Sequence, residues 1–248
     1  MTDLVKRGSE TAKNGFKNEK DISNKFNLWK QDKDAQKWLN VMGYALKNID
    51  KVKAITIGTG HKTDVQVLVY IETKDNVDVQ NISIKLVSNL KGFNQIDKRW
   101  IKKYKELWNF DSKIEELLKH FTGEIKPKII TRDKRRMFLD EFTSDDQNSL
   151  IQWIEKNRLL IVSDTLKGRE PYSASWMLVA QKIQDNQKWV LKPINVVMNH
   201  FNDGCIEITP RGSLKIGRIT MQRKGGDAGR PSANMLQFKI NPAELFEL

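Results

Sequence analysis

The segment HKTDVQVLVYIETKDNVDVQNISIKLVSN, residues 61–89, decides the fold because it contains two runs with the periodicity of β-strands. Apolar residues recur at every second position, at Val65, Val67, Val69 and Ile71 in the first run and at Ile82, Ile84 and Leu86 in the second. A Lys-Asp-Asn cluster within Thr73–Val77 separates the runs and is typical of a turn. The sequence therefore predicts a β-hairpin.

Three polar residues of this hairpin could form a catalytic site. Asp64 opens the first run just after a turn at Gly58–Gly60, and eighteen residues separate it from Ser83. Ser83 and Lys85 share the strand face opposite the isoleucines. A carboxylate can hold a divalent cation for phosphodiester hydrolysis, while an ammonium group orients a water and offsets phosphate charge. On its own the pattern favours ordinary surface residues, because a motif with one acid is weak.

Composition limits the class of protein. The 248 residues suffice for one large or two modest domains, and 39% hydrophobic content favours a folded chain. No window approaches the apolar length of a membrane span, and the N-terminal stretch MTDLVKRGSETAKNG has no apolar core of a signal peptide. The single cysteine, Cys205, excludes a disulfide framework and a cysteine-based zinc site. We therefore expect a soluble, cytoplasmic protein.

The charge is strongly positive. The chain has 43 Lys and Arg against 31 Asp and Glu, for a formal net charge of +12. Such an excess indicates a polyanionic partner, and in a cytoplasmic protein nucleic acid comes first.

The N-terminal part predicts helices followed by strands. Helical apolar spacing covers Ser9–Lys30 and Ala35–Lys47, and a short strand follows at Lys51–Ile57. We expect Gly15 to let the first helix approach a sheet closely, with Glu19 pointing toward the edge of that sheet, although a solvated Glu19 is the simpler interpretation. The order of elements predicts an α+β fold with a mixed β-sheet flanked by helices.

The middle of the chain predicts more helices and a soft boundary. A helix from Asp97 to Asn109 would carry many basic residues, either as a solvated face or as a surface that follows DNA phosphates. A soft boundary is expected at 123–132. Helices are predicted at Asp111–His120, at a segment that opens with a capping box at Ser144, and at Pro193–Val197. Strands are predicted at Ser175–Lys182 and Lys188–Leu191.

The C-terminal third combines short strands with basic, glycine-rich turns. Arg211–Arg230 contains six basic residues and one acid, Asp227. Within it, Gln222, Arg223, Lys224 and Asp227 are residue types suited to reading base edges in the major groove. A mobile, solvated hairpin tip is the alternative interpretation.

Seven blocks along the chain resemble a known protein family. They are Lys13–Lys20, Val87–Asn89, Gly92–Lys98, His120–Glu124, Asp133–Phe138, Gln222–Asp227 and Ala233–Lys239. In this order they resemble the HinP-type Type II restriction endonucleases, which cut GCGC and belong to the PD-(D/E)xK nuclease superfamily. The resemblance covers essentially the whole chain.

The resemblance implies a catalytic site that uses Mg²⁺. Asp64 matches the metal-binding aspartate, Lys85 the catalytic lysine and Glu19 an assisting acid on a helix. The Ile84 main-chain carbonyl matches a further metal ligand of the superfamily. Ser83 stands where the family has glutamine, and this departure puts the rate of the reaction in doubt.

The resemblance also implies how DNA is recognised. Gln95 matches a loop residue that enters the minor groove, with Lys98 beside it, and the loop that follows Gln222 is expected to read the major groove. A flexible CG step would ease the bending of the DNA. The expected DNA-binding residues are Gln95, Lys98, Arg211, Gln222, Arg223, Lys224, Asp227 and Arg230.

We expect, in sum, a Type II restriction endonuclease with a catalytic core at 1–125 and a DNA-recognition part at 126–248. The resemblance implies a monomer in catalysis, with a dimer possible, and a DNA methyltransferase as functional partner. The competing hypothesis is a sequence-specific DNA-binding protein on the same fold whose catalysis is weakened or lost, and Ser83 is the residue in its favour. An RNA-binding protein is less expected, because no aromatic stacking motif of the usual RNA-binding modules is present.

Overall fold

The structure, a computed structural model, describes residues 3–58, 61–71, 77–129, 131–184, 186–226 and 230–248. The chain divides into two compact units. Unit 1 comprises Met1–Lys6, Gln95–Thr165 and Met198–Ile240, and unit 2 comprises Arg7–Asn94, Leu166–Val197 and Asn241–Leu248. Both units are discontinuous in sequence, so the boundary expected near residue 125 lies inside unit 1.

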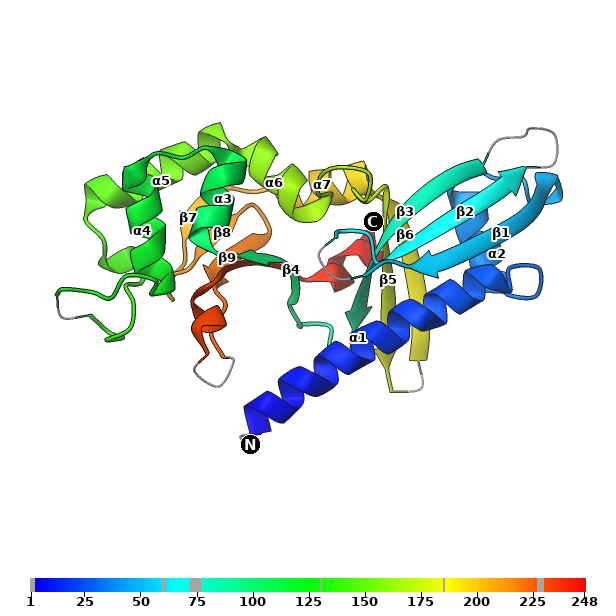
Figure 1. The fold of residues 1–248 in the computed structure, drawn as a ribbon, viewed down its shortest axis with the longest axis horizontal. Coiled ribbons are helices and arrows are strands. Elements are labelled where there is room, and N and C mark those ends of the chain that lie inside the picture. The colour runs from blue at the N-terminus through cyan, green and yellow to red at the C-terminus, as the bar shows by residue number, and fades with distance from the viewer. Residues whose placement is uncertain (1–2, 59–60, 72–76, 130, 185, 227–229) are drawn as a thin grey trace. The chain divides into compact units, whose positions relative to one another are not determined.

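Figure 1 shows the helices and strands. The α-helices are α1 (Asp3–Asn27), α2 (Lys33–Val41), α3 (Ile101–Trp108), α4 (Ser112–Thr122), α5 (Ser144–Lys156), α6 (Arg158–Leu166) and α7 (Ile194–Asn202). The strands are β1 (Ile49–Thr56), β2 (Val65–Ile71), β3 (Val77–Val87), β4 (Asn94–Arg99), β5 (Trp176–Ile183), β6 (Asn186–Pro193), β7 (Ile206–Ile208), β8 (Leu214–Ile216), β9 (Ile219–Arg223) and β10 (Leu236–Ile240). Short 3₁₀ helices are η1 (Leu46–Asn48), η2 (Leu139–Glu141), η4 (Pro231–Asn234) and η5 (Pro242–Glu247).

Unit 2 contains a mixed sheet in the order β1-β2-β3-β5-β6. The predicted hairpin is confirmed: β2 and β3 pair antiparallel, with Val65 opposite Ile82. β3 then pairs parallel with β5, which places Ser83 opposite Met177 and Lys85 opposite Val179. The expected turn at Gly58–Gly60 lies partly outside the described residues. Most of the expected turn at Thr73–Val77 also lies outside them.

The apolar side of this sheet packs against α1 and α2. Ile82 and Ile84 of β3 are buried in one core with Ile22 and Phe26 of α1. Because side chains alternate along a strand, Ser83 and Lys85 leave β3 on the other side. The expectation for Gly15 in the first helix is wrong, because a Cβ at this position would meet nothing within 4 Å, and the neighbouring Phe16 is 56% exposed. Gly15 therefore does not serve a close approach between helix and sheet.

Unit 1 contains a second sheet, in the order β4-β10-β9-β8-β7, together with α3, α4 and α5. Its core is rich in aromatic rings: the ring centroid of Tyr104 lies 4.4 Å from that of Trp108 and 5.6 Å from that of Phe238. The buried Asp164 carboxylate accepts hydrogen bonds from Arg99 Nη1 at 2.7 Å and Trp108 Nε1 at 2.9 Å. This ion pair ties the end of β4 to α6.

Several expected boundaries differ from the structure. The helix expected at Ala35–Lys47 ends at Val41, where Met42 is its C-cap. Residues 94–99 form the strand β4, whereas the sequence predicts that a helix begins at Asp97. The strand forms because it pairs with β10 and because the buried Asp97 Oδ1 accepts a hydrogen bond from Tyr104 Oη at 2.5 Å. The N-cap of α5 is Thr143, whose hydroxyl accepts from Asp146 N, and not Ser144. The helix expected to start at Pro193 begins at Ile194 and runs to Asn202.

No helix in the described part of the chain is long and apolar enough to span a membrane.

Candidate active site

Backbone pairing holds Asp64 at the start of β2. Its N–H donates to the Ile82 carbonyl at 2.9 Å, and its own carbonyl accepts from Ile57 N at 2.9 Å. Asp64 is therefore bonded to β3 on one side and to the end of β1 on the other. The pairing of Val65 with Ile82 then brings Asp64 next to Ser83, its neighbour on β3.

The Asp64 carboxylate accepts from the next two residues of β3. Its Oδ2 atom accepts from the Ile84 N–H at 2.5 Å and from Ser83 Oγ at 3.2 Å. The same oxygen lies 3.5 Å from Lys85 Nζ. The structure thus brings Asp64, Ser83 and Lys85 together, as the sequence predicts.

Lys85 completes this cluster. Its Nζ atom donates to Ser83 Oγ and to the Ile84 carbonyl, both at 3.0 Å. The Lys85 side chain is only 15% exposed, and Ser83 is buried. The Ser83 hydroxyl therefore bridges the acid and the ammonium group, and it keeps both in a fixed orientation.

Glu19 of α1 lies within electrostatic reach of the same cluster. Burial and, to a lesser extent, the negative charge of Asp64 raise the pKa of Glu19 from 4.5 to about 7, and the positive charge of Lys85 acts in the opposite direction. Two carboxylates that repel each other in a partly buried place form a site where a cation is stabilised. The structure therefore joins the predicted helix-borne acid to the residues of β2 and β3.

The chemistry of these groups fits a hard divalent cation. Mg²⁺ prefers oxygen ligands and is commonly held by one or two carboxylates with several waters. The carboxylates of Asp64 and Glu19 and the Ile84 carbonyl are ligands of this type. In the part of the chain that the structure describes, no group of three or more His, Cys, Asp or Glu residues could hold a metal ion.

The residues expected to contact DNA belong to unit 1, whereas the cluster on β2 and β3 belongs to unit 2. Gln95 and Lys98 are exposed on β4, which is a strand and not the expected loop and helix start. Arg211 is exposed in the turn between β7 and β8, and Gln222 is partly buried on β9 opposite Gln237. Lys224 follows β9, Arg230 is exposed before η4, and Asp227 lies outside the described residues.

Arg223, the last residue of β9, has internal partners. Its Nε atom donates to the Thr122 carbonyl at 2.8 Å, and its Nη2 atom donates to Asn234 Oδ1 at 2.7 Å. Thr122 is the last residue of α4, so the guanidinium satisfies a free carbonyl at a helix C-terminus, where positive charge is favoured. These contacts indicate that Arg223 positions its surroundings. A contact between Arg223 and a base stays a prediction.

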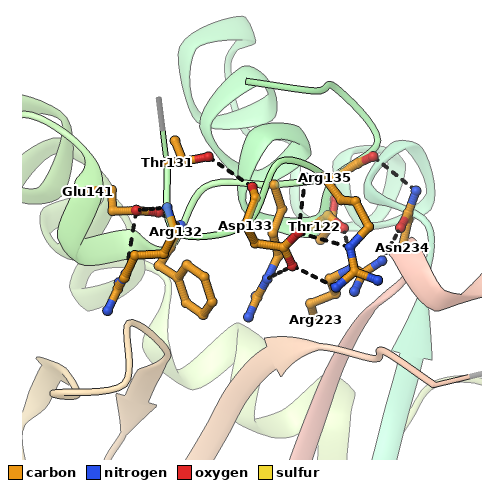
Figure 2. Close-up of polar contacts among 11 residues, drawn as sticks. Thr122, Thr131, Arg132, Asp133, Arg135, Glu141, Arg223 and Asn234 are labelled. Carbon is orange, nitrogen blue, oxygen red and sulfur yellow. Dashed lines mark hydrogen bonds and ion pairs between the residues drawn. The ribbon is translucent and has the colours of Figure 1, made fainter. Parts of the chain in front are cut away.

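The sequence reasoning gave no role to a polar cluster around Asp133, which Figure 2 shows beside Arg223. Asp133 pairs with Arg135, and this hydrogen-bonded contact lowers the pKa of Asp133 to about 2. The signal in the sequence was the basic run Lys134-Arg135-Arg136, but only the folded chain brings Arg223 next to it.

Comparisons with known proteins found one family model and similar solved structures. A family model described as R.HinP1I restriction endonuclease matches residues 42–246. Among solved structures, the chain is similar to restriction endonuclease MspI in complex with its cognate DNA, with a TM-score of 0.62 and 18% identity over 89% of this chain and 87% of that chain. At this identity the likeness concerns the fold. No curated protein matched.

Proposed function

Because the chain belongs to the R.HinP1I restriction endonuclease family, we propose that it uses Mg²⁺ to cut double-stranded DNA at GCGC. Membership of the family makes it a Type II site-specific deoxyribonuclease, and enzymes of this kind use divalent metal ions. The choice of Mg²⁺ and of GCGC is our proposal, and it rests on the resemblance of the seven sequence blocks. A related tetranucleotide centred on CpG is the alternative target.

The observation that supports this function best is the cluster of Asp64, Ser83 and Lys85 at the junction of β2 and β3. In the proposed mechanism, Asp64, Glu19 and the Ile84 carbonyl would hold the cation. When bound, Mg²⁺ lowers the pKa of water and offsets the charge of the phosphate. Lys85 donates to the attacking water and to a phosphate oxygen, so that the water is aligned with the scissile bond.

Unit 1 supplies DNA recognition in this proposal. Exposed Gln95 and Lys98 on β4 contact the minor groove, and the chain that follows β9 contacts the major groove. The proposed set comprises Gln95, Lys98, Arg211, Gln222, Arg223, Lys224, Asp227 and Arg230.

Digestion of a sequenced plasmid tests the function directly. The protein is incubated with the plasmid in Mg²⁺ or in EDTA, and the fragment ends are determined by run-off sequencing. We expect discrete fragments in Mg²⁺ alone, with every end inside a GCGC site. Ends within another CpG-centred tetranucleotide would replace the target and keep the enzyme class, whereas random ends would refute sequence specificity.

A second candidate function, binding without cleavage, is favoured by one residue. Ser83 stands where the resemblance implies glutamine, and its hydroxyl is engaged by both Asp64 and Lys85. An intact plasmid together with a salt-sensitive mobility shift on GCGC-containing DNA would support this candidate. Ser83→Gln separates the two functions, because recovery of cleavage would show that only the rate had been lost.

We further propose that the enzyme acts as a monomer in the cytoplasm, together with a methyltransferase that protects the same site in host DNA. Sedimentation velocity with a single-site duplex gives the stoichiometry, and digestion of CpG-methylated plasmid tests the protection.

A further inference from the structure

The turn Asp133–Arg136 presents one arginine to solvent and holds it rigidly. Arg136 N donates to the Asp133 carbonyl at 3.1 Å, which closes the turn, and Met137 N donates to the His120 carbonyl at 2.9 Å. A Cβ on Gly123 would lie 2.6 Å from the Arg135 carbonyl oxygen, so the turn packs directly on the end of α4. Figure 2 shows the polar contacts of this cluster. The backbone under Arg135 is therefore anchored to a helix.

Asp133 fixes the guanidinium of Arg135. Arg135 Nε donates to Asp133 Oδ1 and Arg135 Nη2 to Oδ2, each at 2.9 Å, and the Arg135 N–H donates to Oδ1 at 3.0 Å. The carboxylate is 18% exposed, whereas the Arg135 side chain is 71% exposed. A guanidinium has five N–H donors, and the bidentate pair uses two of them. The Nη1 and Nη2 donors on the outer edge form a fork that is open to solvent.

The neighbouring arginines are engaged in other ways. Arg223 donates to Thr122 and Asn234. Arg136 is 16% exposed, with its guanidinium 3.8 Å from the ring centroid of Phe138, and Arg132 stacks on the same ring at 4.3 Å. Of these four arginines, Arg135 is the one whose side chain is mostly exposed. Arg136 and Arg223 contribute positive potential around it, which Asp133 and, at Arg136, Glu141 offset in part.

We propose that Arg135 reads a guanine in the target DNA and that Asp133 is its positioning residue. This inference rests on the proposed function, since it supplies that function with a specificity-determining contact. A fork of two parallel N–H donors matches the O6 and N7 acceptors of guanine in the major groove. A guanidinium whose orientation is already fixed by a carboxylate loses little conformational entropy when it binds. A backbone phosphate offers the same pair of acceptors, so the test has to distinguish the two.

Binding measurements on catalytically silent protein provide that test. The background is Lys85→Ala, and affinity is followed by fluorescence anisotropy without divalent metal on three duplexes: GCGC-containing, the same duplex with 7-deazaguanine, and an unrelated sequence. We expect Arg135→Ala to lower affinity for the GCGC duplex by about 5- to 150-fold with little change on unrelated DNA. The exposed neighbour Lys134→Ala is the matched control, and it should weaken all three complexes alike.

The modified base identifies the contact. Removing N7 should weaken binding of the parent protein and leave binding of the Arg135→Ala variant nearly unchanged, because the partner of the missing acceptor is already gone. Arg135→Lys should behave like Arg135→Ala, since an ammonium lacks the fork. Asp133→Asn removes a negative charge, so it should tighten binding to unrelated DNA while it weakens the response to 7-deazaguanine.

Two results would overturn the proposal. Equal losses on GCGC and unrelated DNA for Arg135→Ala, with a salt slope reduced by about one, would make Arg135 a phosphate contact. A parent protein that ignores 7-deazaguanine would exclude the guanine contact even if plasmid cleavage proceeds. Conversely, absence of cleavage with the 7-deazaguanine response intact would refute the proposed chemistry and leave this inference standing.

Discussion

A single carboxylate oxygen organises the candidate active site. Asp64 Oδ2 accepts from Ile84 N and Ser83 Oγ and faces Lys85 Nζ at 3.5 Å. The residues of β3 come from one strand, so their spacing follows from local geometry. Their meeting with Asp64 requires the hairpin register.

The first prediction concerns Lys85. Lys85→Ala should lower the cleavage rate by at least about 100-fold, because the attacking water and the phosphate lose a positioned donor. Binding to DNA should change little. Single-turnover cleavage and anisotropy measure the two effects separately. Lys53→Ala, which removes an exposed lysine from β1 of the same unit, is the control and should cut at the parent rate. A Lys85→Ala enzyme with full activity would contradict the assignment of the site.

The second prediction concerns Glu19 and pH in metal-free protein. The pKa of Glu19 is about 7 in the folded chain, raised first by burial and then by Asp64, against 4.5 for a free side chain. The folded state therefore keeps this proton where the unfolded chain releases it. Its contribution to stability is fully present below about pH 4.5 and is lost as the pH rises through about 7.

Urea unfolding in EDTA at pH 5 and pH 8 measures this effect. The free energy of unfolding of the parent protein should carry a loss between the two pH values that is smaller in Glu19→Gln. Glu10→Gln, a change at an exposed position of the same helix, should keep the parent dependence. Identical pH dependence in the parent and Glu19→Gln would show that the pKa of Glu19 is not raised in the folded protein.

At the scale of elements, the end of α4 supports the turn that carries Arg135. Gly123 is the C-cap, with φ +86°, and the oxygen of Arg135 occupies the space that a side chain would need. Gly123→Ala should lower the free energy of unfolding by about 1–3 kcal/mol, because it adds backbone strain and steric overlap.

A second glycine substitution, Gly15→Ala, should change the free energy of unfolding in the opposite direction. Gly15→Ala in α1 meets open space, and it should stabilise the protein by about 0.5–1 kcal/mol, because alanine favours a helix interior. Urea unfolding curves give both values. A neutral Gly123→Ala would mean that the turn moves away from α4 at no cost.

β4 shows why a local pattern can fail for an element. The basic and aromatic residues after Asp97 have helical spacing, and from Ile101 onward a helix does form. Asp97 itself is buried beneath Tyr104, and Arg99 pairs with the buried Asp164, 65 residues away. These contacts, with the pairing of β4 and β10, outweigh local propensity.

At the scale of the whole molecule, the net charge of +12 predicts a strong salt dependence of DNA binding. Contacts to six or more phosphates release counterions, so affinity should fall by about 10³-fold or more between 50 and 200 mM salt. Anisotropy titrations on GCGC-containing and unrelated duplexes measure this slope. Base contacts release no counterions, so the two curves should be displaced by a nearly constant factor. Affinity that is insensitive to salt would contradict a phosphate-dominated interface.

The two proposed tasks, catalysis and DNA recognition, belong to different units, and the segments of these units alternate along the sequence. Glu19, Asp64 and Lys85 belong to unit 2, whereas Gln95, Arg135 and the chain that follows β9 belong to unit 1. A single cut in the sequence could not describe this arrangement, because each unit is assembled from segments distant along the chain.

The sequence by itself determined the hairpin, the mixed-sheet class and the cluster of Asp64, Ser83 and Lys85. Strand periodicity and a short connection are local properties, so they fix which faces and which neighbours meet. Tertiary structure decided that residues 94–99 form a strand, that Arg223 is bonded to Thr122 and Asn234, and that Asp133 holds Arg135. The strand at 94–99 and the contacts of Arg223 depend on partners far along the chain. The end of α4 supports Asp133 and Arg135 through packing that no periodicity in the sequence encodes. Contacts of this kind are selected by the burial and hydrogen bonding of the complete fold.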